Sequence, residues 1–63
     1  MKKLEVNCKY LKGYKFINET IFGNNAEELI IKIKNKLYNN NYEYAVAYME
    51  GKYYYSITNK RIL

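Results

Sequence analysis

The sequence predicts an α+β domain in which one helix packs on one face of a four-stranded, mostly antiparallel sheet, in the order ββαββ. Two segments in which polar and apolar residues alternate, each interrupted by a glycine, predict two hairpins. Between them, apolar residues recur at helical spacing behind an asparagine, which predicts one helix. A chain of 63 residues has room for a single domain, residues 1–63.

The first hairpin is expected to have strands at about 3–10 and 14–22. Apolar side chains occupy every second position of its first strand: Leu4, Val6, Cys8 and Tyr10. Residues 11–13 predict a three-residue turn, because Gly13 adopts left-handed backbone without strain.

This register sets Tyr14 opposite Tyr10 and Phe16 opposite Cys8. The second strand then has a blurred pattern, because Ile17 and Ile21 point to the other face. We therefore expect either a bulge near Asn18 or partial cover of both faces of this strand.

The helix is expected at about 26–38. Asn25 is a strong N-cap, and Glu28 can complete a capping box. One apolar stripe is available to face the sheet: Ala26, Leu29, Ile30, Ile33 and Leu37. Ile31 and Tyr38 lie off that stripe, one above the other, and predict either a widened core edge or a second contact surface.

The second hairpin is expected to have strands at about 42–49 and 52–59. Because a helix with large side chains approaches a sheet most closely over small residues, Ala45 and Ala47 predict the helix side of this hairpin. The turn, however, can have three residues (49–51) or two (50–51).

The two turns distribute the tyrosines differently. A three-residue turn puts the following on the helix side: Tyr53, Tyr55 and Ile57. The opposite face then carries Tyr42, Tyr44, Tyr48 and Tyr54, together with Lys52. A two-residue turn instead moves Tyr53 and Tyr55 to the face of Tyr42, Tyr44 and Tyr48. In both registers one face carries several tyrosines, which form either the core or an exposed or dimer-buried platform.

The composition limits how this small domain is stabilised and what it binds. One cysteine, Cys8, excludes an internal disulfide and is expected to be a buried core thiol. Because the core of so short a chain is marginal, we expect a homodimer. The net charge of +5 favours acidic partners, and the absence of a long apolar segment predicts a cytoplasmic protein without membrane contact.

Catalytic chemistry is not expected. The chain contains no His and no Asp, so the usual proton-transfer groups and triads are missing, and no cofactor or metal motif is present. The prediction is therefore a protein that is not an enzyme and that holds neither a metal nor a cofactor.

Three resemblances to known families do not change this prediction. The stretch GKYYYSITNKRIL resembles half of the GIY-YIG nuclease motif, but the glycine after the second Tyr-Ile pair is absent. Residues 52–57 resemble the aromatic strand of an RNA-recognition motif, which needs two helices. The stretch IFGNNAEELIIKIKNKL is similar to part of a phage inhibitor of uracil-DNA glycosylase, whose acidic surface this Lys-rich helix lacks.

Three functions remain open. The first is a small inhibitor or regulator, encoded by a phage or mobile element (anti-CRISPR or other anti-defence type), that occludes a host protein or nucleoprotein surface. The second is binding of RNA or single-stranded nucleic acid, and the third is a structural homodimer. The binding residues expected are Tyr42, Tyr44, Tyr48, Tyr54, Lys52, Lys60 and Arg61. The abundance of Lys, Asn, Ile, Tyr and Phe, which have AT-rich codons, favours the phage or plasmid origin.

Overall fold

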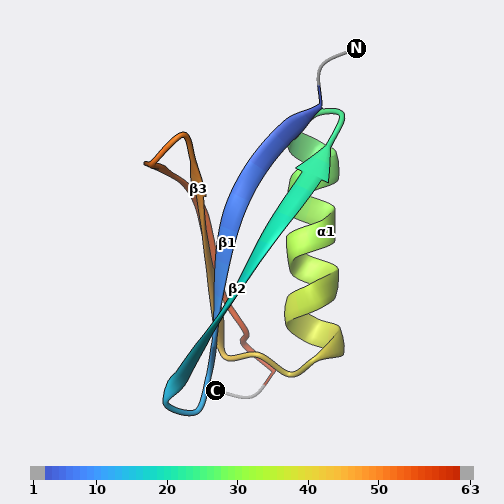
Figure 1. The fold of residues 1–63 in the computed structure, drawn as a ribbon. Helices are drawn as coiled ribbons and strands as arrows, with labels where there is room; N and C mark the ends of the chain where they lie inside the picture. The colour runs from blue at the N-terminus through green and yellow to red at the C-terminus, as the bar shows by residue number, and fades with distance from the viewer. Residues whose placement is uncertain (1–2, 62–63) are drawn as a thin grey trace.

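A computed structural model describes residues 3–61 and confirms the predicted ββαββ architecture (Figure 1). The elements are β1 (Leu4–Lys12), β2 (Lys15–Gly23), α1 (Ala26–Asn39), β3 (Tyr44–Met49) and β4 (Lys52–Thr58). The strands form one antiparallel sheet in the order β2-β1-β3-β4. The helix α1 lies along one side of this sheet and contacts β1, β2 and β3.

The core lies between α1 and the sheet. The helix contributes Leu29, Ile33 and Leu37, all fully buried. The sheet and the segment before β3 contribute Val6, Cys8, Tyr10, Ile21, Tyr42, Ala45 and Ala47. The expected position of the helix over Ala45 and Ala47 is confirmed, because both alanines are fully buried in this layer.

The start of α1 is fixed by reciprocal hydrogen bonds. The backbone N–H of Glu28 donates to Asn25 Oδ1 at 2.9 Å, and the backbone N–H of Asn24 donates to Glu28 Oε2 at 3.0 Å. These bonds satisfy donors that the first helical turn leaves without partners. The bond from Asn24, followed by the ion pair with Lys32, lowers the pKa of Glu28.

The first turn is shorter than predicted. Lys12 pairs with Lys15, so the turn contains two residues, Gly13 and Tyr14, and Gly13 has a φ of +64°. Glycine with positive φ at the first central position is typical of a type II′ turn, which suits the twist of a hairpin. The predicted three-residue turn over residues 11–13 is therefore wrong.

This turn explains the blurred pattern of the second strand. Ile17 pairs with Tyr10, and Ile21 pairs with Val6, so both isoleucines lie on the helix side. The pairing continues along the whole of β2 without a shift, and the bulge expected near Asn18 is absent from it. Phe16 lies on the opposite side of the sheet.

The second hairpin combines features of both predicted registers. Met49 pairs with Lys52, so Glu50 and Gly51 form a two-residue turn, with φ values of +53° and +79°. Positive φ at both central residues is the signature of a type I′ turn.

A bulge then changes the side on which the tyrosines of β4 lie. Tyr48 pairs with Tyr53 but Ala47 pairs with Tyr55, which leaves Tyr54 as an extra residue in β4. Tyr53 consequently lies on the face of Tyr48, as the two-residue turn predicts. Tyr55 lies on the helix side, as the three-residue turn predicts, and Ile57 lies there too, opposite Ala45.

Candidate functional site: the uncovered face of the sheet

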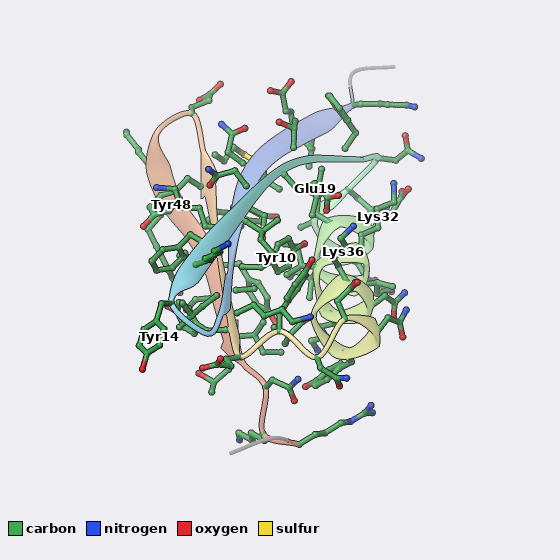
Figure 2. The ribbon with its side chains drawn as sticks, turned by 60° about the horizontal axis from the view of Figure 1, so that its bottom comes forward. Tyr10, Tyr14, Glu19, Lys32, Lys36 and Tyr48 are labelled. Atoms are coloured by element: carbon green, nitrogen blue, oxygen red, sulfur yellow. The ribbon has the colours of Figure 1, made fainter. Side chains whose placement is uncertain are left out.

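The side of the sheet that faces away from α1 is left uncovered by residues 3–61, and we call it the open face. Figure 2 shows Tyr10 between the sheet and the helix and Tyr48 on the opposite side. Strand alternation and pairing assign the members of the open face. They are Glu5, Asn7, Lys9, Leu11, Phe16, Asn18, Thr20, Phe22, Tyr44, Val46, Tyr48, Tyr53, Ser56 and Thr58.

Aromatic side chains cross the open face in two rows. Pairing places Phe16, Leu11 and Tyr44 in one row, and it places Tyr48 beside Tyr53 in the other. Phe16 is 60% exposed and Tyr53 is 64% exposed, whereas the open-face side chains of β3 are half-buried by their neighbours. The Tyr53 hydroxyl also shares a hydrogen bond with Ser56 Oγ at 2.8 Å, which holds its ring over β4.

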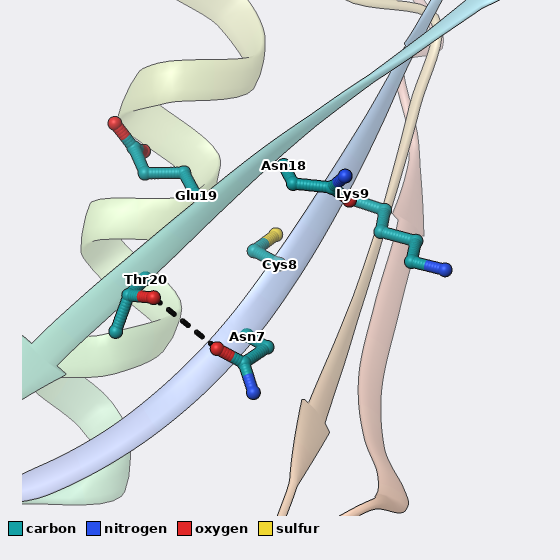
Figure 3. A pocket seen from close by; sticks show the side chains of 6 residues that line it. All are labelled: Asn7, Cys8, Lys9, Asn18, Glu19 and Thr20. Carbon is teal, nitrogen blue, oxygen red and sulfur yellow. Dashed lines mark hydrogen bonds between the residues drawn. The ribbon is translucent and has the colours of Figure 1, made fainter.

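A shallow depression of about 330 Å³ lies over the middle of β1 and β2 (Figure 3). It is lined by Asn7, Cys8, Lys9, Asn18, Glu19 and Thr20. Thr20 Oγ1 donates a hydrogen bond to Asn7 Oδ1 at 3.2 Å. In Figure 3, Lys9 and Asn18 stand on one side of the strands, while Glu19 points towards the helix. The open face is thus apolar and aromatic at its margins and polar in this depression.

The open face is almost neutral although the chain is basic. Its strand positions carry one lysine, Lys9, and one carboxylate, Glu5. Lys3 is exposed and directly precedes β1, near Glu5 and Asn7. The remaining described cations lie on α1, on the helix side of the two turns, or beyond β4. They include Lys12, Lys15, Lys32, Lys34, Lys36, Lys52, Lys60 and Arg61. Most of the positive charge of the described residues therefore lies on other surfaces than the aromatic side chains of the open face.

The structure places two of the predicted binding residues, Tyr44 and Tyr48, on the open face. Tyr42 is not there, because it precedes β3, is 7% exposed and stacks on Tyr10 with ring centroids 4.9 Å apart. The segment is held in place by Asn59, which is fully buried and donates from Nδ2 to the Tyr42 carbonyl at 2.9 Å. The predicted placement of Tyr42 on the exposed platform is wrong.

The predicted residues of β4 and of the segment beyond it are also dispersed. Tyr54 is the bulged residue and packs against the core cluster, and Lys52 lies opposite Met49 on the helix side. Arg61 stacks on Tyr38, with its guanidinium carbon 4.4 Å from the ring centroid, and Lys60 is its exposed neighbour. The seven residues do not form one surface.

The two residues of the predicted second contact surface, Ile31 and Tyr38, also differ in their surroundings. Tyr38 is half-buried and packs against the core, which matches the alternative of a widened core edge. Ile31 is 49% exposed.

The open face contains residues that the sequence analysis missed. Phe16 and Tyr53 belong to it because both turns have two residues, and Lys9 belongs to it through the alternation of side chains along β1. The glycine positions allowed a two-residue turn in each hairpin, but the bulge at Tyr54 has no separate signal in the sequence.

Two reactive groups lie on the opposite, buried side of β1. Cys8 is fully buried, as predicted, and burial raises the pKa of its thiol. Burial also raises the pKa of the Tyr10 hydroxyl, which lies beside Cys8 but has no hydrogen-bond partner of good geometry among the described residues. A buried thiol with a raised pKa is a poor nucleophile, so Cys8 acts in packing.

No family model, no curated protein and no solved structure matches this chain. Among residues 3–61, the structure contains no helix with the length and apolar character needed to cross a bilayer.

Proposed function

We propose that this chain is a non-enzymatic binding protein that docks its open face onto a folded protein. The observation that carries the proposal is an uncovered sheet face with exposed Phe16 and Tyr53 and half-buried Tyr44 and Tyr48. Aromatic side chains and few charges are typical of the centre of a protein interface, because they bury much area at low cost in conformational entropy.

The size of the open face suits this role. Four strands at a spacing of about 4.8 Å, each six to nine residues long, give a surface of roughly 400–600 Å² in plan. Protein partners of a standard interface each bury about 800 Å² of accessible surface, so the open face supplies most of one. The small size and the AT-rich codon preference support a regulator of the kind that phages and mobile elements encode.

Binding of single-stranded nucleic acid by the same face has less support. Stacked bases require cations nearby for the phosphates. Lys9 is the cation among the strand positions of the open face, and Lys3 lies at its end, before β1. Lys52 and Arg61 lie away from Tyr44 and Tyr48, so they do not supply that charge.

The test is a comparison of immobilised variants in capture from a bacterial host lysate, followed by reconstitution with the purified partner. We expect the wild-type chain to retain one protein near stoichiometric amounts and Tyr44→Ser/Tyr48→Ser to lose it. The matched control is Tyr14→Ser/Ile31→Ser, which changes two exposed apolar residues outside the open face and should keep the partner. Retention by the Tyr44→Ser/Tyr48→Ser variant, or loss by the control, contradicts the proposal.

A further inference from the structure

Exposed apolar side chains gather on one edge of the sheet. In the described residues they concentrate on β2 and its turn, at Tyr14, Phe16, Ile17 and Phe22. β2 is an edge strand, and no other segment crosses in front of it in Figure 1. Natural edge strands are protected by bulges, charges or covering segments. β2 has no bulge, and its two charged residues are Lys15 beside the turn and Glu19, which is paired with Lys36.

The backbone of β2 is available for pairing with another strand. Lys12 and Lys15 flank a two-residue turn and form a hydrogen-bonded pair, so alternate residues from Lys15 onward bond to β1. The N–H and C=O groups of the intervening residues, Phe16, Asn18, Thr20 and Phe22, consequently point outward. Lys32 Nζ donates to the Phe22 carbonyl at 2.6 Å, which agrees with this direction, and a carbonyl can accept a second bond.

The two edges of the sheet differ in this respect. The pairing of β2 with β1 is regular along its whole length, whereas β4 carries the bulge at Tyr54. A bulge twists an edge away from regular pairing. β2 is therefore the edge that a partner strand can extend.

The residues of β2 are complementary to a reversed copy of themselves. The stretch FINETIF, residues 16–22, has the same chemical order in both directions about Glu19. An antiparallel pairing centred on Glu19 sets Phe16 against Phe22, Ile17 against Ile21 and Asn18 against Thr20 of the second copy. Such like-with-like cross-strand pairs are the unit of sheet stabilisation.

We propose that two copies of this chain pair antiparallel through β2, about a two-fold axis at Glu19, and form one eight-stranded sheet. A two-fold interface needs a self-complementary surface, and this register provides one. Moving the centre to Asn18 sets Ile17 against Glu19, and moving it to Thr20 sets Ile21 against Glu19. Both alternatives place an apolar side chain opposite a carboxylate.

The charge at the axis is balanced. Glu19 would face Glu19 of the second copy, which alone is unfavourable. Each Glu19 Oε2, however, lies 3.0 Å from Lys36 Nζ of its own chain, on the helix side of the sheet (Figure 2). The two ion pairs together give two carboxylates and two ammonium groups around the axis.

The geometry leaves room for both helices and keeps the open face free. A two-fold axis perpendicular to the sheet places both helices on the same side. Because α1 contacts β1, β2 and β3, it lies inward of the edge, and the strand spacing of about 4.8 Å separates the two helix axes by roughly 10–14 Å. That distance is no shorter than the roughly 8–10 Å of packed helices. The dimer is independent of the proposed function and would present two open faces side by side.

The first test measures mass by sedimentation equilibrium over a wide dilution series. We expect the wild-type chain to be a dimer and Asn18→Pro to be a monomer, because proline removes an outward N–H without breaking a bond to β1. The matched control is Ser56→Pro on the β4 edge, which should remain a dimer. Circular dichroism melting establishes that each variant is folded.

The second test examines the register and does not depend on tolerance of proline. In a Cys8→Ala background, which prevents a disulfide between Cys8 and its cross-strand neighbour, Glu19→Cys should oxidise to a covalent dimer. Phe16→Cys in the same background should not, because the two Phe16 positions lie far apart in this register. A monomeric wild-type chain, a dimer that survives Asn18→Pro, or equal cross-linking of both cysteine variants overturns the proposal.

Discussion

Two buried side chains with polar atoms, Asn59 and Tyr10, differ in whether those atoms have hydrogen-bond partners. Asn59 donates from Nδ2 to the Tyr42 carbonyl and accepts at Oδ1 from the Arg61 N–H at 2.9 Å, so both polar atoms of its amide have a partner. The Tyr10 hydroxyl is equally buried but has no hydrogen-bond partner among the described residues. Replacing each side chain should therefore change stability in opposite directions.

For Tyr10, we expect Tyr10→Phe to raise the free energy of unfolding by about 1 kcal/mol, because it removes a buried hydroxyl without a partner. Urea denaturation measures the change. Tyr44→Phe, at a half-buried residue of the open face, is the control and should leave stability nearly unchanged. A loss of stability in Tyr10→Phe would show that this hydroxyl is satisfied in solution.

For Asn59, we expect Asn59→Ala to lower the free energy of unfolding by about 1–3 kcal/mol, because it leaves the Tyr42 carbonyl without its donor. The fluorescence of the tyrosines should change with it, since the segment that holds Tyr42 against Tyr10 loosens. Thr58→Ala, at an exposed neighbouring position, should have little effect on either measurement. An Asn59→Ala variant as stable as the wild type would contradict this account.

The thiol of Cys8 predicts a pH dependence. Its pKa is raised in the folded state by burial, so the unfolded chain loses this proton at lower pH than the folded one. The contribution to stability is fully present below the unfolded pKa and is lost as the pH rises through the folded value. Between about pH 8 and 9, below the usual pKa of Tyr and Lys, stability should fall, and Cys8→Ala should reduce the slope. Equal slopes for both chains would exclude the thiol as the cause.

At the scale of elements, the two hairpins look alike in sequence but turn differently. The sequence YLKGYKF has its glycine at the first position of a turn, whereas YMEGKYYYS has its glycine at the second, behind Glu50. Glu50 consequently adopts a left-handed backbone, which costs a residue with a Cβ roughly 1–2 kcal/mol.

This difference gives a prediction for the second turn. Glu50→Asn should raise the free energy of unfolding by about 0.5–1 kcal/mol, because Asn tolerates that backbone and Asn-Gly suits a type I′ turn. Glu50→Ala, which has the same steric cost as Glu, is the control and should give no such gain. Thermal unfolding compares the three chains, and equal gains in both variants would point to removal of charge as the cause.

The element scale also shows what could be predicted from the sequence. The helix and its cap followed from Asn25 and from local spacing, and the sheet side under it followed from Ala45 and Ala47. Cross-strand register did not follow, because the same glycine fits a turn of two or three residues. One residue of difference moves every side chain to the other face, which is how Phe16 and Ile17 exchanged sides.

The uncertainty in register also explains part of the difference between the predicted binding surface and the observed placement of its residues. Tyr44 and Tyr48 were placed correctly by alternation, but Tyr42 lies outside the regular strand and is directed inward by Asn59. Lys52 and Tyr54 depend on the turn and on the bulge. Long-range hydrogen bonds and bulges leave no periodic trace in a single sequence, so these placements required the structure.

At the scale of the whole molecule, the separation of charge from aromatic side chains predicts how the chain treats nucleic acid. With a net charge of +5, weak binding to single-stranded oligonucleotides is expected at low salt, falling as salt increases. Tyr44→Ser/Tyr48→Ser should not change it, because these rings do not stack bases. Fluorescence anisotropy measures both effects, with a Lys32→Gln/Lys34→Gln variant as the comparison that should weaken binding. A large loss in the tyrosine variant would favour the nucleic-acid alternative.

The strand order β2-β1-β3-β4 also determines how the chain reaches this structure. Each hairpin joins neighbours in the sequence and can close on a timescale of about 1–10 μs. The central pairing joins Asn7 to Tyr48, on either side of the helix, so it requires a much longer loop to close. We expect the pairing of β1 with β3, after the two hairpins have formed and while α1 packs on the sheet, to set the rate of folding. Mutations along β1 and β3 should therefore slow folding most.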